Sequence, residues 1–103
     1  MATNPLDRLS QQQMARQTGT EFFDLLGYPN PFTEATTLVI NSSSSDDVLV
    51  RIFDISGQLM LTKTVKANVQ FTIGEGLAAG IYFAEATQGN EKRHLKLVKT
   101  IDN

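Results

Sequence analysis

The stretch DVLVRIFDISGQLMLTKTV (residues 47–65) contains two runs of strand-forming residues joined by a short polar turn. In the first run the side chains alternate between two faces, with Val48, Val50 and Ile52 on one and Leu49, Arg51 and Phe53 on the other. The charged Arg51 marks the second face as the wetter one. Asp54 and Gly57 take the first and fourth positions of a turn, which suits type I geometry. The stretch therefore predicts a β-hairpin with one buried face.

The same period of two recurs through the rest of the chain after Tyr28. Further strands are expected within residues 35–41, 68–74, 81–87 and 92–101, separated by the Ser/Asp-rich segment 41–47, the Gly-rich segment 74–80 and the pair Gly89-Asn90. The side chains expected to face inward are Val69, Phe71, Ile73, Leu95 and Leu97. In residues 81–87 the alternation places Tyr82, Ala84 and Ala86 on one face and Ile81, Phe83 and Glu85 on the other. Six or seven short strands without an intervening helix predict an antiparallel β-sandwich, with a small barrel as the alternative. The connections are too short for the crossovers of a parallel sheet.

The first 23 residues differ from the rest because they are polar and rich in Gln. We expect a linker, a frayed short helix or a vector-derived leader in residues 1–23, and the folded domain in residues 24–103. This segment has no apolar core of the kind that a secretory signal needs. The longest apolar runs of the chain are far shorter than the ~20 residues of a membrane helix.

Composition narrows the classes of function. A length of 103 residues allows one domain with a modest core. The formal net charge of −2 argues against a nucleic-acid partner, since phosphate contacts need a basic surface. The chain has no cysteine, which excludes disulfides and thiolate metal sites.

Residues with catalytic potential are few and poorly arranged. His94 is the only histidine and lies in the middle of a predicted strand, while serines 42–45 fall in a turn without a Gly-x-Ser-x-Gly motif. Asp46, Asp47 and Asp54 lack the spacing of a calcium loop, and the Gly-rich segment 74–80 lacks the lysine of a phosphate loop. We therefore expect no enzyme activity, no metal and no cofactor.

Two terminal features remain. In Tyr28-Pro29-Asn30-Pro31-Phe32 the prolines remove backbone donors, so this segment is expected to lie along the sandwich edge without joining its ladder, anchored by Tyr28 and Phe32. At the other end, the last predicted strand, residues 92–101, contains Lys92, Lys96 and Lys99. They either prevent unwanted pairing of an edge strand or display that strand to a partner.

Three segments taken together indicate a family. YPNPF (28–32), IFDISGQLM (52–60) and GLAAGIYFAEATQGNEKRHLKLVK (76–99) resemble, in this order and spacing, the type A C-terminal sorting domain of the type IX secretion system of Bacteroidetes. The resemblance covers residues 28–100. The chain departs from the family pattern in its last residues, TIDN, because the family usually ends near its final lysine.

The resemblance implies an immunoglobulin-like sandwich at the C-terminus of a larger cargo protein, which passes through the periplasm to the cell surface or the medium. It implies recognition by outer-membrane translocation and shuttle proteins and removal by a sortase-like cysteine protease, with cleavage before Tyr28. The residues that match the sorting motifs are Pro29, Asn30, Pro31, Asp54, Gly57, Gly80, Tyr82, Lys96, Leu97, Val98 and Lys99.

The rival interpretation is an immunoglobulin-like adhesion, spacer or carbohydrate-binding module of a surface protein. Carbohydrate binders usually present aromatic platforms. This chain has no Trp, and only Tyr28, Tyr82 and six phenylalanines are available for that purpose.

Overall fold

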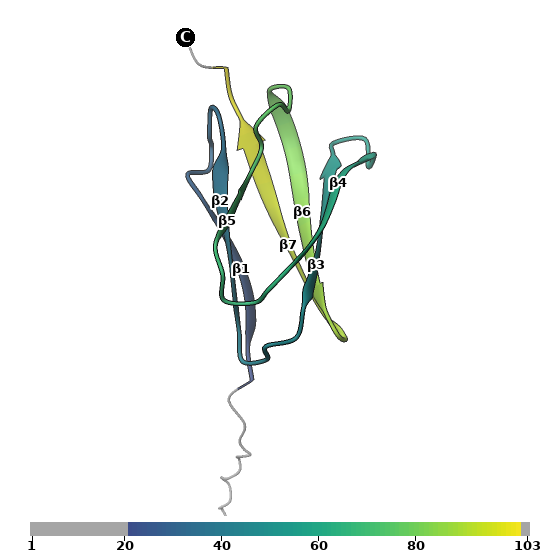
Figure 1. Ribbon diagram of the computed structural model, residues 1–103. Helices are drawn as coiled ribbons and strands as arrows, with labels where there is room; N and C mark the ends of the chain where they lie inside the picture. Colours follow the sequence, from purple (N-terminus) through teal and green to yellow (C-terminus); the bar gives the residue numbers. More distant parts are fainter. Residues whose placement is uncertain (1–20, 102–103) are drawn as a thin grey trace, which may run out of the picture.

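The computed structural model describes residues 21–101, which form two β-sheets (Figure 1). The linker, frayed helix or leader expected in residues 1–23 lies mostly outside the described residues. The seven strands are β1 (Phe23–Tyr28), β2 (Thr36–Ser42), β3 (Val48–Asp54), β4 (Leu59–Val65), β5 (Phe71–Ile73), β6 (Gly80–Gln88) and β7 (Glu91–Lys99). Within the described part of the chain, no helix could cross a membrane.

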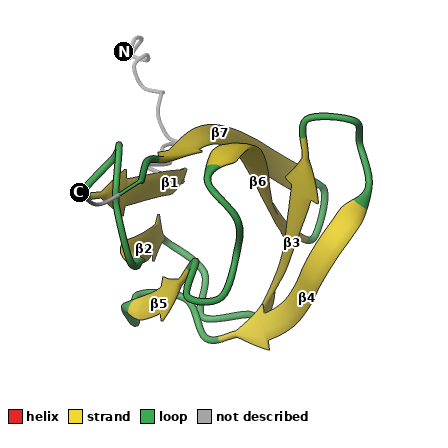
Figure 2. Ribbon diagram, turned by 90° about the horizontal axis from the view of Figure 1, so that it is seen from above, coloured by secondary structure: helices red, strands yellow, loops and turns green. Residues whose placement is uncertain are grey.

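The two sheets have the orders β1-β2-β5 and β4-β3-β6-β7, and every strand pair within them is antiparallel. Seen from above, the two sheets face each other across the core (Figure 2). The chain crosses between the sheets after β2, after β4 and after β5. The prediction of an immunoglobulin-like antiparallel β-sandwich is therefore confirmed.

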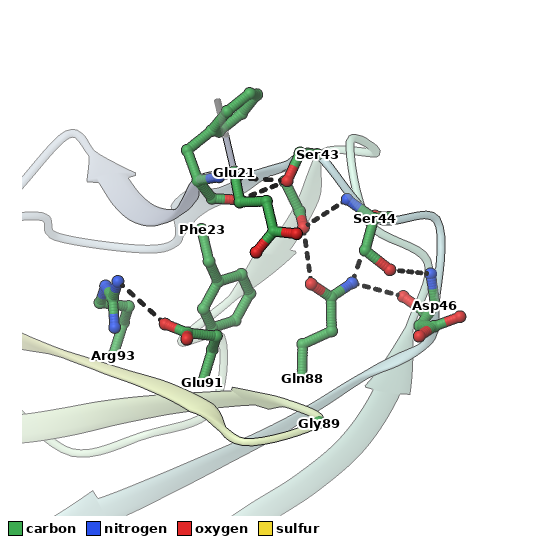
Figure 3. Close-up of a pocket in the computed structure, with 11 residues that line it drawn as sticks. Glu21, Phe23, Ser43, Ser44, Asp46, Gln88, Gly89, Glu91 and Arg93 are labelled. Atoms are coloured by element: carbon green, nitrogen blue, oxygen red, sulfur yellow. Dashed lines mark hydrogen bonds and ion pairs between the residues drawn. The ribbon is translucent and has the colours of Figure 1, made fainter. Parts of the chain in front are cut away.

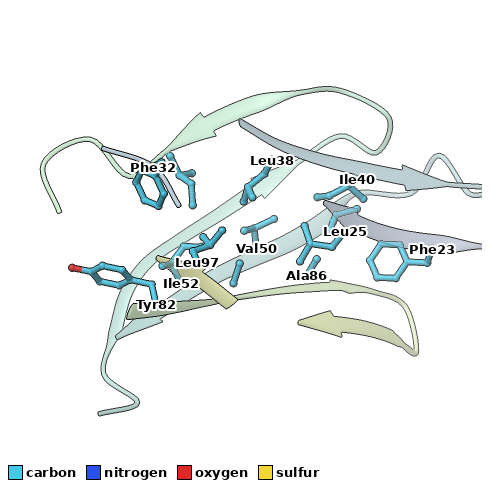
Figure 4. Packing of buried hydrophobic residues seen from close by; sticks show 13 residues of the cluster. Phe23, Leu25, Phe32, Leu38, Ile40, Val50, Ile52, Tyr82, Ala86 and Leu97 are labelled. Atoms are coloured by element: carbon cyan, nitrogen blue, oxygen red, sulfur yellow. The ribbon is translucent and has the colours of Figure 1, made fainter. Parts of the chain in front are cut away.

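Side chains from the inner faces of both sheets form a single core (Figure 4). Val48, Val50 and Ile52 are fully buried, as the alternation in β3 predicts. The core also contains Phe23, Leu25, Phe32, Leu38, Ile40, Ile73, Tyr82, Ala84, Ala86 and Leu97. Burial of these apolar side chains is the main term that stabilises the sandwich.

Both predicted hairpin turns are present. Between β3 and β4, the amide of Gly57 donates to the carbonyl of Asp54 over 2.9 Å. Gly57 has a φ of 91°, which a residue with a side chain rarely adopts. Between β6 and β7, Gly89 and Asn90 form the two-residue connection, because Gln88 pairs directly with Glu91. Local turn chemistry thus sets the register of both hairpins.

The strand β1 was not identified from the sequence, because its residues FDLLGY include Asp and Gly, which are poor strand formers. Pairing with β2 over the whole of β1 overrides this weak propensity. Gly27 also permits a close approach, since a Cβ there would lie 3.0 Å from side-chain carbons of Leu38 and Leu95. The poor strand former therefore serves the packing between the sheets.

The prediction that Val69 belongs to the core is wrong, because β5 begins at Phe71 and the Val69 side chain is 54% exposed. Asn68 accounts for the difference. Its φ is 66°, and its backbone amide donates to the carbonyl of Ile40 over 2.7 Å. Its side chain accepts from the amide of Ser42 and donates to the carbonyl of Ser42. The segment before β5 is thus held against β2 as a loop.

The core position of Leu38 in β2 gives a direct test of this packing. Leu38→Ala removes a fully buried side chain, and we expect a loss of about 2–5 kcal/mol in the free energy of unfolding. Leu26→Ala is the matched control, because Leu26 lies on the outer face of the same sheet and is 51% exposed. Denaturant unfolding measures both changes, and equal losses in the two variants would contradict this arrangement of the core.

Candidate functional site

The opening motif binds the closing strand directly. The side-chain amide of Asn30 donates to the carbonyl of Lys96 over 2.8 Å, and its oxygen accepts from the amide of Val98 over 3.0 Å. Asn30 therefore pairs with the outer edge of β7 as a neighbouring strand would. Two motifs that are 66 residues apart in sequence meet at this point.

Phe32 continues the pairing with its backbone. Its amide donates to the carbonyl of Val98 over 2.9 Å, and its carbonyl accepts from the amide of Thr100 over 2.8 Å. Phe32 thereby forms a parallel bridge with Lys99. We call these contacts of Asn30 and Phe32 with residues 96–100 the junction. The prediction that the proline segment stays off the ladder is wrong at Phe32.

The two prolines fit the junction because the hydrogen bonds to β7 come from the Asn30 side chain and the Phe32 backbone. The missing N–H groups of Pro29 and Pro31 are therefore not needed. Both peptide bonds that precede these prolines are cis. The carbonyl of Pro29 accepts from the Thr36 hydroxyl over 2.8 Å, which ties the segment to β2.

A buried aromatic ring lies beneath the junction. Phe32 is almost fully buried, as predicted, whereas Tyr28 is 52% exposed, so the expectation that Tyr28 anchors the segment is wrong. The Phe32 ring packs on Gly74, where a Cβ would lie 2.5 Å from a ring carbon. The ammonium of Lys99 donates to the carbonyl of Gly74 over 2.6 Å and lies 5.9 Å from the ring centroid. Lys99 is thus half-buried and bound to the domain itself.

The sequence singled out the glycines of residues 74–80 only as turn residues and missed the specific role of Gly74. Nothing in the sequence of a Gly-rich segment distinguishes a glycine that faces solvent from one against which an aromatic ring packs. At Gly76, for example, an added Cβ would meet no atom within 4 Å. The difference depends on Phe32, which is remote in sequence.

Two further motif residues have internal partners. Tyr82 is buried in the core, and its hydroxyl donates to the carbonyl of Ala78 over 2.6 Å. Leu97 is also buried in the core. Gly80 pairs with Lys99 at the end of the β6–β7 ladder. These residues build the framework behind the junction.

Asp54 organises the β3–β4 turn with its carboxylate, which accepts from the hydroxyl and amide of Ser56 and from the amide of Gln58. The hydrogen bond from the Ser56 hydroxyl, followed by that from the Gln58 amide, lowers the pKa of Asp54 below its ordinary value. Pro31, Gly57 and Lys96 are exposed, and Val98 is half-buried. The recognition role of the motif residues stays a prediction.

The motif residues gather at one end of the sandwich. The junction lies where β7 ends, and the β3–β4 turn with Asp54 and Gly57 projects at the same end (Figure 1). Residues 29–31 and 96–99 are brought into contact, whereas the β3–β4 turn is separated from them by β3 and β6. The chain enters β1 at the opposite end, beside the β6–β7 hairpin (Figure 1).

The outer edge of β7 is already occupied over its last part. The carbonyls of Lys96 and Val98 and the amides of Val98 and Thr100 bond to Asn30 or Phe32. A partner strand cannot add to these groups without displacing the opening motif. Display of this part of β7 for strand addition is therefore excluded while the junction is intact.

A cluster of charges lies on the outer face of the four-stranded sheet. The Glu85 carboxylate accepts from Nε and Nη2 of Arg51 over 3.0 and 2.6 Å, and it lies 3.2 Å from His94 Nε2 and 3.9 Å from Lys92 Nζ. Burial raises the pKa of Glu85, but the hydrogen bonds from Arg51 and His94 and the nearby cations outweigh it and lower the pKa. His94 is exposed, as predicted, and it contacts a carboxylate.

A hollow of about 540 Å³ lies at the end where the chain enters the domain (Figure 3). Its polar groups bond to one another. The Ser42 hydroxyl and Gln88 Oε1 are 2.6 Å apart, and Gln88 Nε2 donates to the carbonyls of Asp46 and Ser44. This network ties the loop after β2 to the end of β6 beside the β6–β7 hairpin.

No group of three or more His, Cys, Asp or Glu side chains that could hold a metal ion occurs in residues 21–101. Asp46 and Asp47 lie in the loop after β2, whereas Asp54 lies in the turn after β3. Ser42 bonds to Gln88 and to the amide of Ser44, Ser44 bonds to the amide of Asp46, and His94 bonds to Glu85. The described residues thus do not bring the candidate serines, His94 and these aspartates into one site.

The fold and the junction define an immunoglobulin-like β-sandwich module whose two terminal motifs are joined. The family whose model matches this chain, over residues 27–100, is the secretion system C-terminal sorting domain. The chain belongs to this family, whose domains are sorting signals of type IX secretion. Membership implies a secreted or surface protein.

Comparison with solved structures supports the fold. The chain is similar to dimeric latent PorU from Porphyromonas gingivalis, with a TM-score of 0.58 and 19% sequence identity. The match covers 84% of this chain and 10% of PorU, so this chain spans about a tenth of that protein. No curated protein matches the chain. At this identity the likeness shows a shared fold alone.

The junction can be tested at Asn30. Asn30→Ala removes both side-chain bonds to β7, and we expect faster hydrogen exchange at the Val98 amide and a loss of about 1–2 kcal/mol in the free energy of unfolding. Asn30→Asp keeps an acceptor for Val98 but places a carboxylate against the Lys96 carbonyl, so we expect an intermediate Val98 exchange rate. Unchanged exchange at Val98 in Asn30→Ala would contradict the junction.

The charge cluster predicts a specific response to acid. Because the pKa of Glu85 is lowered from its ordinary value of 4.5, its contribution to stability is present above that value and is lost as the pH falls below it. We expect the free energy of unfolding of Glu85→Gln to depend less on pH below about 4.5 than that of the wild type. The same measurement on Asp54→Asn serves as the comparison, because the pKa of Asp54 is also lowered and this carboxylate also contributes to the acid dependence of the wild type. An identical acid dependence of Glu85→Gln and the wild type would refute the assignment.

Proposed function

We propose that this domain is a non-catalytic C-terminal sorting signal that directs a larger cargo protein through the type IX secretion system and across the outer membrane. The observation that carries the proposal is the family match over residues 27–100. The junction supports it, because the opening and closing motifs of the family form one structural unit. The sorting function is then a property of the folded end of the sandwich.

The cargo connects through the segment before Phe23, because Phe23 is the first residue of β1 and belongs to the core of the folded domain. A sortase-like cysteine protease removes the domain after export. Cleavage within β1 would take away a strand that pairs with β2 over six residue pairs. We therefore place the cut before Phe23, upstream of the first strand.

The route runs through the periplasm to the cell surface or the medium. The partners are outer-membrane translocation and shuttle proteins of the type IX system. The rival function, a carbohydrate-binding or adhesion module, has less support, because Tyr82 is buried and cannot serve as an aromatic platform. The exposed Phe22, Tyr28 and Phe83 do not form one platform, because Phe22 precedes β1, Tyr28 ends β1 and Phe83 lies in β6 of the other sheet.

A reporter fusion tests the proposal. Residues 21–103 are attached to the C-terminus of a reporter that carries its own signal for export to the periplasm, in a bacterium with an active type IX system. We expect most of the reporter at the surface or in the medium. The reporter without the domain, and the fusion in a strain without the type IX system, should stay in the periplasm. Retention of the fusion in the competent strain would refute the sorting function.

A further inference from the structure

The outer face of the four-stranded sheet carries a row of apolar side chains next to the junction. The register places Leu59 opposite Phe53, Phe53 opposite Phe83, and Phe83 opposite Lys96. One cross-strand row therefore runs over all four strands and ends on a lysine. Directly opposite residues in antiparallel strands lie close enough for their side chains to touch.

This row is accessible to solvent. Leu59 is 49% exposed and Phe83 37% exposed, while Phe53 is half-buried. The adjacent pair Ile81 and Val98 extends the apolar area toward the end of β7. A contiguous apolar area on the solvent face of a sheet marks an interaction surface more often than scattered apolar residues do.

The same face is positively charged. The outward-facing cations of this sheet are Arg51, Lys92 and Lys96. Within the described residues, Glu85 is the one carboxylate that shares this face with them. The whole chain, in contrast, has a net charge of −2. Arg51 lies 5.8 Å from the Phe53 ring centroid, so the charge borders the apolar row directly. A partner with an acidic surface complements this face.

The face is rigid and open. Leu97 is buried in the core, which forces its neighbours Lys96 and Val98 outward, and the junction fixes the backbone of both. Within residues 21–101 the other elements lie on the inner side of the sheet (Figure 2). Lys96 is therefore presented on a fixed strand, in contrast to Lys99, which is bound to Gly74.

We infer that the outer face of the β4-β3-β6-β7 sheet, centred on Phe53, Phe83 and Lys96, docks a polypeptide with an acidic rim and an apolar centre. The inference rests on the proposed function, because this polypeptide is the component of the secretion machinery that receives the domain. A face four strands wide and seven residues long measures roughly 15 by 23 Å. This size is typical of a small, transient interface, which suits a signal that must be released.

Paired substitutions in the reporter fusion test the inference. Phe83→Thr with Lys96→Glu changes the proposed face and keeps residues that strands accept. Leu26→Thr with Lys63→Glu is the matched control, because Leu26 lies on the outer face of the other sheet and Lys63 pairs with Val50 on the opposite face of β4. Thermal unfolding of the purified domains shows that each variant is folded. We expect loss of export for the first pair and normal export for the second.

The outcomes separate the two hypotheses. If the wild-type fusion is exported and both variant pairs are exported equally, the docking face is refuted and the sorting function stands. If the wild-type fusion is retained in the periplasm, the sorting function fails and the docking face fails with it. Lys96→Arg keeps the charge, and its normal export next to a retained Lys96→Glu single variant would support an acidic partner. Loss of export in both the Lys96→Arg and the Lys96→Glu variant would refute recognition by charge.

An anionic membrane is the competing occupant of this face. Sedimentation of the purified wild-type domain with vesicles of phosphatidylglycerol and phosphatidylethanolamine tests it. We expect no binding, because an apolar row that lies flat on a sheet offers no side chain for deep insertion into a bilayer. Binding that is lost in the Phe83→Thr, Lys96→Glu variant would assign the face to lipid and would overturn the polypeptide partner.

Discussion

The two hydrogen bonds between the Asn30 side chain and the backbone of β7 hold together the end of the molecule that carries its motifs. An asparagine side chain carries an NH2 donor group and a carbonyl acceptor in one plane, so it can replace a strand backbone at a sheet edge. The prolines on either side could not do this, and the backbone of Phe32 completes the pairing. The position of Lys99 over Phe32 accompanies this pairing, because Phe32 and Lys99 form a parallel bridge.

Several motif residues have structural partners inside the domain. Pro29, Tyr82, Leu97 and Lys99 all have partners inside the domain, so a substitution that abolishes sorting at these positions need not touch a receptor. Lys96 and its neighbours on the outer face are different, because their side chains point to solvent from a fixed backbone. The sandwich thus separates residues that build the signal from residues that can be read by a partner.

Period-two alternation and turn chemistry were sufficient to predict the sandwich, both hairpin turns and the buried face of β3, because these depend on neighbours within a few residues. The sequence did not reveal β1, because β1 is stabilised by its pairing with β2. It misplaced Val69, because hydrogen bonds from the side chain of Asn68 to Ser42 hold this segment as a loop. The same reason explains the site. The motif residues could be named from the sequence, but their contact, the role of Gly74 and the pairing of His94 with Glu85 could not.

The distance along the chain between the two halves of the junction has a consequence for synthesis. Asn30 leaves the ribosome 66 residues before Lys96, and until β7 is made and folded Asn30 and the Phe32 backbone lack their partners in β7. An unfinished or truncated polypeptide that lacks β7 therefore has both prolines and the middle turn but no assembled end. The junction therefore forms only on a chain that contains β7 and has folded.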